Sequence, residues 1–237
     1  MLYAALFFGI LVIILTGKAA QISKSLSILG IIGQISAALI MIMIGKLEVR
    51  YILLGNLIDI GYLTIPFTLL LLIGLTNVMN IEKGQNNSIL FFPFVSFSCF
   101  SLLAYFTGNS FVFKTGMCSS LIIIFLLVLG AFSGKQFKGR NLTTSIGFLI
   151  AVVAISFIQA SILAIYIPLF TLALPMTLYS HLQVKLTAEQ STAITSLTAI
   201  LFGVLLFIIP SNMMWVLLVG LTILLVIMQF SRKYRFI

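Results

Sequence analysis

Charged residues are scarce in this sequence: Asp, Glu, Lys and Arg make up 7% of its 237 residues. A soluble domain has about 25% charged residues, because its surface must be solvated. Hydrophobic residues make up 62% of the chain, and the mean hydropathy is +1.28. So few charges cannot cover a surface in water. The composition therefore excludes a soluble globular protein and indicates a chain that lies largely in a lipid bilayer.

The residue types that bind metals and perform acid–base catalysis are also scarce. The chain has four acidic residues, one histidine and two cysteines without CxxC spacing. A carboxylate metal site needs several oxygen ligands at one place, and a structural zinc site needs four Cys or His ligands. The topology predicted below places Glu48 and Asp59 outside the membrane and Glu82 and Glu189 inside. We therefore predict no metal site and no catalytic residue, and assign His181 no role.

Long apolar runs recur along the chain, and a helix needs about 20 such residues to cross a membrane. The run Leu121–Leu129 is apolar on all sides, whereas a transmembrane β-strand alternates apolar and polar residues. The predicted fold is therefore an all-α membrane bundle of about nine transmembrane helices, forming a single domain, 1–237. The predicted spans are Leu2–Thr16, Leu26–Gly45, Gly61–Asn80, Ser88–Phe106, Lys114–Ser133, Thr143–Ile158, Ser161–Ser180, Ser191–Ile209 and Met213–Phe230, with an alternative division of the sixth and seventh around Gln159.

The basic residues predict the orientation of the bundle, because short cytoplasmic segments are enriched in Lys and Arg. With the N-terminus outside, the three outer basic residues are Lys46, Arg50 and Lys114. The remaining ten of the thirteen are cytoplasmic: Lys18, Lys24, Lys83, Lys135, Lys138, Arg140, Lys185, Arg232, Lys233 and Arg235. This bias predicts N-out and C-in. The chain has a net charge of +9, and we expect its basic residues to contact the lipid bilayer. We do not expect nucleic acid to bind, because the chain has no soluble region to present a basic patch.

Two irregular segments stand out in this arrangement. The longest connection, Lys46–Ile60, lies outside and is predicted to lie partly along the membrane interface. Pro168 and Pro175 are seven residues apart on one predicted helix, so they share a face and predict a kink. Such a kink can line a cavity or can serve packing alone.

The spans carry no ionisable residue in their middle, which argues against proton- or ion-coupled transport.

Several stretches, taken in order, resemble the polyprenyl-phosphate N-acetylhexosamine-1-phosphate transferases, the enzymes that begin bacterial teichoic acid, O-antigen and peptidoglycan lipid-intermediate synthesis. Leu29–Ala38 is similar to the family helix that follows a paired-aspartate loop. Gly74–Ile81 resembles the family run Ile-Thr-Asn-x-x-Asn-Leu. Lys135–Gly139, followed by Gly147–Leu149, falls where the family has a Gly-Asp-Thr-Gly loop, and Pro168 and Pro175 keep a family spacing. The resemblance covers about Lys18–Ile200 and implies a multi-pass protein of the bacterial plasma membrane.

The resemblance implies a transfer of sugar phosphate from a UDP-sugar to polyprenyl phosphate, organised by magnesium and carboxylates. The positions of those carboxylates are occupied differently here. The loop Gly17–Ser25 contains no acid, Lys83 and Asn86 stand at the aspartates after Asn80, and Arg140 and Leu178 stand at two further acids. The family magnesium site is therefore expected to be lost, and no cofactor is predicted.

The leading hypothesis is a catalytically inactive homologue, a pseudoenzyme. It would bind polyprenyl phosphate or another membrane protein of envelope polymer synthesis. Lys83, Lys138 and Arg140 are candidate ligands of a lipid phosphate, or else ordinary positive-inside residues. Asn77 and Asn80 share a helix face and either line a cavity or bond between helices. The alternatives are an active phospho-N-acetylhexosamine transferase and a transporter of lipid-linked sugars.

Overall fold

The computed structural model describes residues 1–22, 27–54, 56–79, 87–133, 139–158, 163–183 and 186–210, with scattered residues from 213 to 223. Most of these residues are helical. The long helices are α1 (Leu2–Ile22), α2 (Ser27–Met43), α3 (Thr64–Val78), α4 (Phe91–Thr107), α5 (Ser110–Ser133), α6 (Arg140–Ile158) and α9 (Ala188–Ile208). Shorter helical segments are η2 (Gly61–Leu63), η3 (Asn87–Leu90), α7 (Leu163–Pro168), η4 (Leu169–Ala173) and α8 (Leu174–Leu182).

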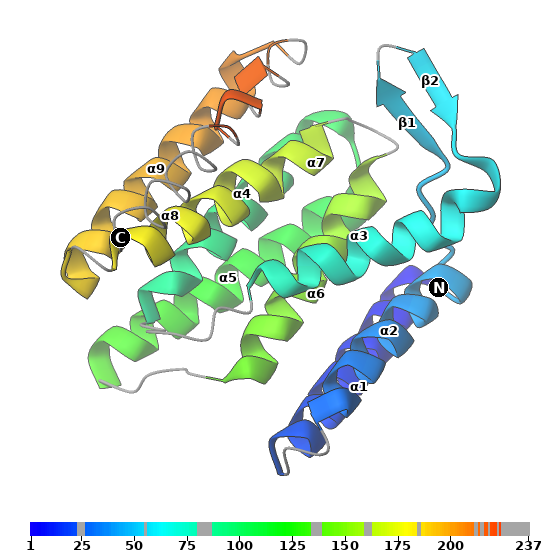
Figure 1. The fold of residues 1–237 in the computed structure, drawn as a ribbon, viewed down its shortest axis with the longest axis horizontal. Coiled ribbons are helices and arrows are strands. Elements are labelled where there is room, and N and C mark those ends of the chain that lie inside the picture. Colours follow the sequence, from blue (N-terminus) through cyan, green and yellow to red (C-terminus); the bar gives the residue numbers. More distant parts are fainter. Residues whose placement is uncertain are drawn as a thin grey trace, which may run out of the picture.

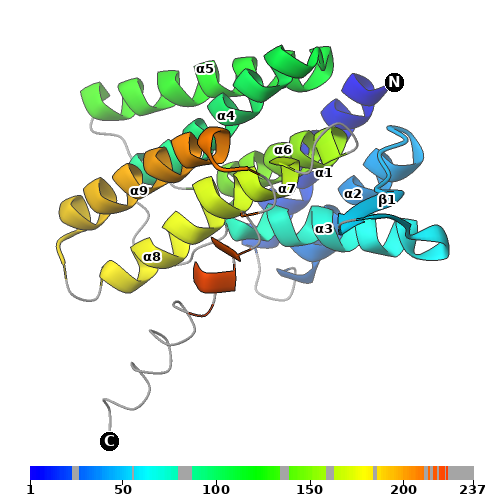
Figure 2. The ribbon, with the colours of Figure 1, turned by 90° about the horizontal axis from the view of Figure 1, so that it is seen from above.

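The helices form one bundle in which consecutive long helices run in alternating directions (Figures 1 and 2). Helices α1 and α2 lie at one side of the bundle and α9 lies at the other (Figure 1). Helix α6 is central, since 72% of its apolar stretch is buried, against 22% in α1. The alternation gathers the C-termini of α1, α3, α5 and α8 and the N-termini of α2, α4, α6 and α9 at one end. We call this the Asn141 end, and the opposite end the hairpin end.

The described residues contain six helices long and apolar enough to cross a membrane, and two shorter apolar helices, Ile28–Met43 and Phe91–Thr107. These findings agree with a helical membrane protein. Eight of the predicted spans coincide with helices, but several ends differ: α1 continues past Thr16, and α5 begins before Lys114. The predicted ninth span falls largely outside the described residues, as do Gln159 and Glu82.

A β-hairpin interrupts the helical pattern, and the sequence analysis did not predict it. Strands β1 (Tyr51–Leu54) and β2 (Asn56–Asp59) pair antiparallel between α2 and α3. They occupy the segment expected to be an interfacial connection. The hairpin extends from the end of the bundle beside the start of α3 (Figure 1). The chain is therefore helical except for this one short ribbon among the described elements.

Glycines allow several helix pairs to approach closely, as is common in membrane bundles. A Cβ atom at Gly33 would overlap Thr16, and one at Gly147 would overlap the carbonyl oxygen of Thr76. At Gly116 a Cβ would lie 2.5 Å from the hydroxyl of Ser101. These contacts join α1 to α2, α3 to α6 and α4 to α5.

The two prolines of the predicted kink flank an irregular helical turn. Between α7 and α8, residues Leu169–Ala173 form a π-helical turn, an arrangement that locally disrupts the regular helix. The hydroxyls of Thr171 in this turn and Ser96 on α4 are buried and lie 2.6 Å apart. Pro168 and Pro175 are also buried, and neither lines the pocket described below. The irregular turn thus takes part in helix packing.

Candidate functional site

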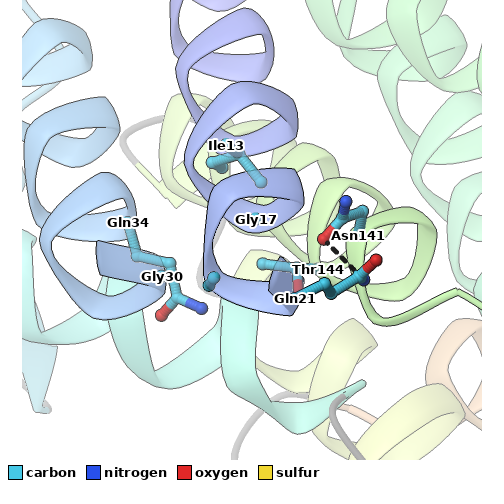
Figure 3. Close-up of a pocket in the computed structure, with 8 residues that line it drawn as sticks. Ile13, Gly17, Gln21, Gly30, Gln34, Asn141 and Thr144 are labelled. Atoms are coloured by element: carbon cyan, nitrogen blue, oxygen red, sulfur yellow. Dashed lines mark hydrogen bonds between the residues drawn. The ribbon is translucent and has the colours of Figure 1, made fainter. Parts of the chain in front are cut away.

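The Asn141 end contains a small polar pocket between α1, α2 and α6 (Figure 3). Its volume is about 30 Å³, which is room for about two water molecules. The pocket is lined by Ile13, Gly17, Ala20, Gln21, Gly30, Gln34, Asn141 and Thr144. Four of the lining side chains are polar and uncharged, namely Gln21, Gln34, Asn141 and Thr144.

Asn141 lies at the start of α6 and reaches the backbone of α1. The approach requires Gly17, because a Cβ atom there would overlap the Asn141 side chain. In one orientation of its amide, Asn141 donates to the carbonyl of Gly17 (3.3 Å) and accepts from the backbone N–H of Lys18 (3.1 Å). In the other orientation its oxygen accepts from Gln21 Nε2 over 3.3 Å, as drawn in Figure 3. Asn141 therefore couples α6 to the last turns of α1 through hydrogen bonds.

Gln34 forms the opposite wall of the pocket and is nearly fully buried, at 7% exposure. Its carbonyl oxygen Oε1 accepts a hydrogen bond from Asn77 Nδ2 over 2.9 Å. Asn77 also donates to the carbonyl of Ile73 over 2.9 Å. A buried amide oxygen without a partner is costly, so Asn77 satisfies Gln34 while connecting α3 to α2. Of the two roles considered for Asn77, the observed one is bonding between helices.

The remaining predicted site residues are only partly described. Lys83, Lys138 and Asn80 lie outside the described residues, and Arg140 is described only as the first residue of α6. This position puts the Arg140 backbone directly beside Asn141, at the same end of the bundle as Asn77. Lys83 and Asn80 follow α3 in sequence, and Lys138 precedes α6.

Of the described acidic residues, only Glu189 lies at the Asn141 end, and it does not line the pocket. Glu48 and Asp59 flank or belong to the hairpin, where Glu48 forms an ion pair with Arg50 (3.1 Å). Glu189 lies in the first turn of α9 and is exposed. Among the described residues, no group of three or more His, Cys, Asp or Glu side chains is arranged to bind a metal. His181 lies in the last turn of α8 and is not among the residues that line the pocket.

Sequence reasoning did not assign a site role to Gln21, Gln34, Asn141 or Thr144. One signal for them is present, because an amide in an apolar span needs a partner and so marks the interior of a bundle. Thr143, Thr144 and Ser145 add three consecutive buried hydroxyl residues at the start of α6, exposed by 4%, 6% and 9%. Which helices these polar groups bring together depends on the tertiary packing.

The pocket offers hydrogen-bond donors and acceptors but no carboxylate among its lining residues. Amide and hydroxyl donors can bind the oxygens of an anionic or neutral polar group. The N-terminus of α6, which adjoins the pocket, adds a partial positive charge. The described part of the site therefore offers hydrogen-bonding groups to a small polar group, and its lining offers no carboxylate or imidazole that would act as a general base.

Comparison with known proteins gives no match: no family model matches the sequence, and no curated protein matches it either. The resemblance noted above therefore depends on the ordered stretches themselves. Any function assigned to the chain is a proposal from those stretches and from the geometry of the Asn141 end.

Proposed function

We propose that this protein is a non-catalytic homologue of the polyprenyl-phosphate N-acetylhexosamine-1-phosphate transferases. In this proposal it binds the phosphate of a polyprenyl lipid, alone or presented by a partner membrane protein. The binding site is the Asn141 end, in the cytoplasmic leaflet of a bacterial plasma membrane. The protein would act in the synthesis of an envelope polymer without transferring a sugar phosphate itself.

The observation that supports this proposal is the convergence of the stretches that carry the resemblance. The end of α1 at Gly17–Ile22, the first turns of α2, the end of α3 around Asn77 and the start of α6 at Arg140 all lie at the Asn141 end (Figure 1). They are separated by up to about 120 residues in sequence, as in the hydrogen bond between Gln21 and Asn141. The alternating directions of the helices bring these stretches to one end of the bundle, where they can contribute to one site.

The chemistry of this end favours a phosphate over a magnesium-bound substrate. The amides of Asn141 and Gln34 and the hydroxyl of Thr144 lie near the start of α6, where Arg140 begins the helix. Fixed positive charge and N–H donors bind phosphate oxygens without a metal. A pocket of about 30 Å³ is too small to enclose a nucleotide sugar, so the ligand is a head group at the pocket mouth whose hydrocarbon chain remains in the bilayer.

The test combines a binding assay with an activity assay on the purified full-length protein in nanodiscs. We expect polyprenyl phosphate to bind and raise the melting temperature, and the matched polyprenol, which lacks the phosphate, to have no such effect. We also expect no magnesium-dependent release of UMP from UDP-N-acetylglucosamine or UDP-N-acetylmuramoyl-pentapeptide, with an active family enzyme as the positive control. Release of UMP above background would overturn the non-catalytic assignment. Equal effects of the two lipids would overturn the phosphate site.

A further inference from the structure

The exposed tyrosines of the described chain are all at one end of the bundle. The structure describes six tyrosines, of which Tyr166 and Tyr179 are buried. The four exposed ones belong to elements that begin or end at the hairpin end: Tyr3, Tyr51, Tyr62 and Tyr105. Exposed tyrosine in a membrane protein is typical of the membrane interface, where the ring contacts lipid chains and the hydroxyl contacts polar head groups.

Ring contacts with the start of α5 place Tyr3 and Tyr105 at nearly the same level of the bundle. Tyr3, in the first turn of α1, packs against Phe111, and the ring centroids are 4.9 Å apart. Tyr105, in the last turn of α4, packs against Phe113 at a centroid distance of 5.9 Å. Phe111 and Phe113 are separated by about 3 Å along the axis of α5. The outer sides of the two tyrosines remain uncovered, at 53% and 67% exposure.

A lysine lies at this same level, on the exposed surface of α5. Lys114 directly follows Phe113 and is the one charged residue of α5. An ammonium group inside an apolar span is costly unless it reaches water or lipid phosphate. The long stem of lysine lets the ammonium group reach the head groups while the methylene groups stay against lipid chains. Lys114 therefore indicates a membrane boundary close to Tyr3 and Tyr105.

The length of the helices beyond this level agrees with the thickness of a bilayer. Gln21, which lines the pocket, follows Tyr3 by 18 residues on α1, or about 27 Å at a rise of about 1.5 Å per residue. Ser133 follows Lys114 by 19 residues on α5, or about 28 Å. The hydrocarbon core of a bilayer is about 30 Å thick. A boundary at Tyr3 therefore puts the second boundary near Gln21.

We propose that Tyr3, Tyr105 and Lys114 lie in the head-group layer of the bilayer at the hairpin end and set the depth of the bundle in the membrane. Their hydroxyl and ammonium groups bind phosphate and carbonyl oxygens of the lipids, and their rings and methylene groups contact the upper lipid chains. Because α1 is one continuous helix from Leu2 to Ile22, this depth puts the pocket at the opposite head-group layer. The proposal does not depend on the proposed function.

Depth-dependent quenching of tryptophan fluorescence tests this placement. The single tryptophan, Trp215, is replaced by phenylalanine, and Tyr3→Trp and Tyr105→Trp are made one at a time in that background. Each variant is placed as one copy per nanodisc of phosphatidylcholine. We expect lipids brominated near the head group to quench both tryptophans at least twofold more than lipids brominated at the chain end.

The matched control is Leu11→Trp, at an exposed position of α1 that lies eight residues, or about 12 Å, beyond Tyr3. It should show the reverse preference and be quenched most by lipids brominated at the chain end. If Tyr3→Trp and Leu11→Trp have the same depth profile, Tyr3 does not mark the boundary and the proposal is wrong.

Two other results would also overturn the proposal. If aqueous iodide quenches Tyr3→Trp and Tyr105→Trp as strongly as it quenches N-acetyltryptophanamide, both positions lie in water. If neither iodide nor brominated lipid quenches them, protein covers this surface. Tyr105→Trp, on a different helix, keeps the test decisive should Tyr3→Trp fail to give folded protein.

Discussion

Asn77 on α3 and Gln34 on α2 are joined by a 2.9 Å hydrogen bond across 43 residues of sequence. Gln34 is nine-tenths buried and lines the polar pocket, whereas Asn77 is exposed at the end of α3. Asn77, which does not line the pocket, therefore holds the side chain of Gln34 in place at the pocket wall. The position of the Gln34 side chain therefore depends on Asn77. The sequence analysis identified Asn77 as a site candidate but assigned no role to Gln34.

Replacing Asn77 with leucine is expected to destabilise the protein by roughly 1 kcal/mol, because Gln34 Oε1 loses its donor while it stays buried. The measurement is reversible unfolding of the purified protein in detergent. The double variant Gln34→Leu/Asn77→Leu serves as the control, since it removes both partners. Its loss should be smaller than the sum of the two single losses. Strictly additive losses would show that the two amides do not act as a pair.

The contact between α3 and α6 at Gly147 gives a second test. A Cβ atom there would overlap the carbonyl oxygen of Thr76, which is backbone and cannot rotate away. Gly147→Ala is therefore expected to cost about 1–3 kcal/mol, as overpacking usually does. The measurement is the same unfolding assay.

Gly74 is the matched control for this substitution. It lies on α3, one of the same two helices, and a Cβ atom there would meet nothing within 4 Å. Gly74→Ala should leave stability unchanged or raise it by up to about 1 kcal/mol, because alanine favours the helix. If the two alanines proved equally harmful, the close approach of α3 and α6 at Gly147 would not explain the effect.

The sequence predicts the centres of the helices well because hydrophobicity over about 20 residues is a local property. It predicts their ends less well. Helix α1 continues through Lys18 and Gln21 to Ile22, where long polar side chains can reach the membrane surface from within a helix. The hairpin was missed for a different reason, since its base depends on a tertiary contact, the hydrogen bond from Val49 to Thr68.

The candidate site shows the same division between local and tertiary information. Asn77 could be identified from sequence because an amide near the end of an apolar span needs a partner. The pocket could not, because Gly17, Gln34 and Asn141 come together only when α1, α2 and α6 pack. Gly17 in particular has no chemical signal of its own. It matters because it leaves space for the side chain of Asn141.

The predicted orientation can be tested by cysteine labelling. In a Cys99→Ala/Cys118→Ala background, Lys46→Cys marks the hairpin end and Glu189→Cys marks the Asn141 end, both at exposed positions. Because ten basic residues are assigned to the cytoplasm, a membrane-impermeant maleimide should label Lys46→Cys in intact cells. Glu189→Cys should react only after the membrane is permeabilised. The opposite pattern would reverse the orientation and move the pocket to the outer leaflet.

The three candidate phosphate ligands of the sequence analysis give the sharpest test of the phosphate site. The triple variant Lys83→Gln/Lys138→Gln/Arg140→Gln is expected to weaken binding of polyprenyl phosphate at least tenfold. A hydrogen bond to a charged group contributes about 1.5–3 kcal/mol, and about 1.4 kcal/mol is tenfold in affinity. The measurement is equilibrium binding in nanodiscs of zwitterionic lipid, at low and at moderate salt. Raising the salt should reduce the difference between variant and wild type.

The control removes the same number of charges from the other end: Lys46→Gln/Arg50→Gln/Lys114→Gln. Both triple variants lower the net charge from +9 to +6, so attraction through net charge alone would weaken binding equally in both. A phosphate site at the Asn141 end requires the control to bind like the wild type while the first variant loses affinity. Equal losses would mean that Lys83, Lys138 and Arg140 are ordinary positive-inside residues. The amides of Gln34 and Asn141 would then serve only to pack α1, α2, α3 and α6 together.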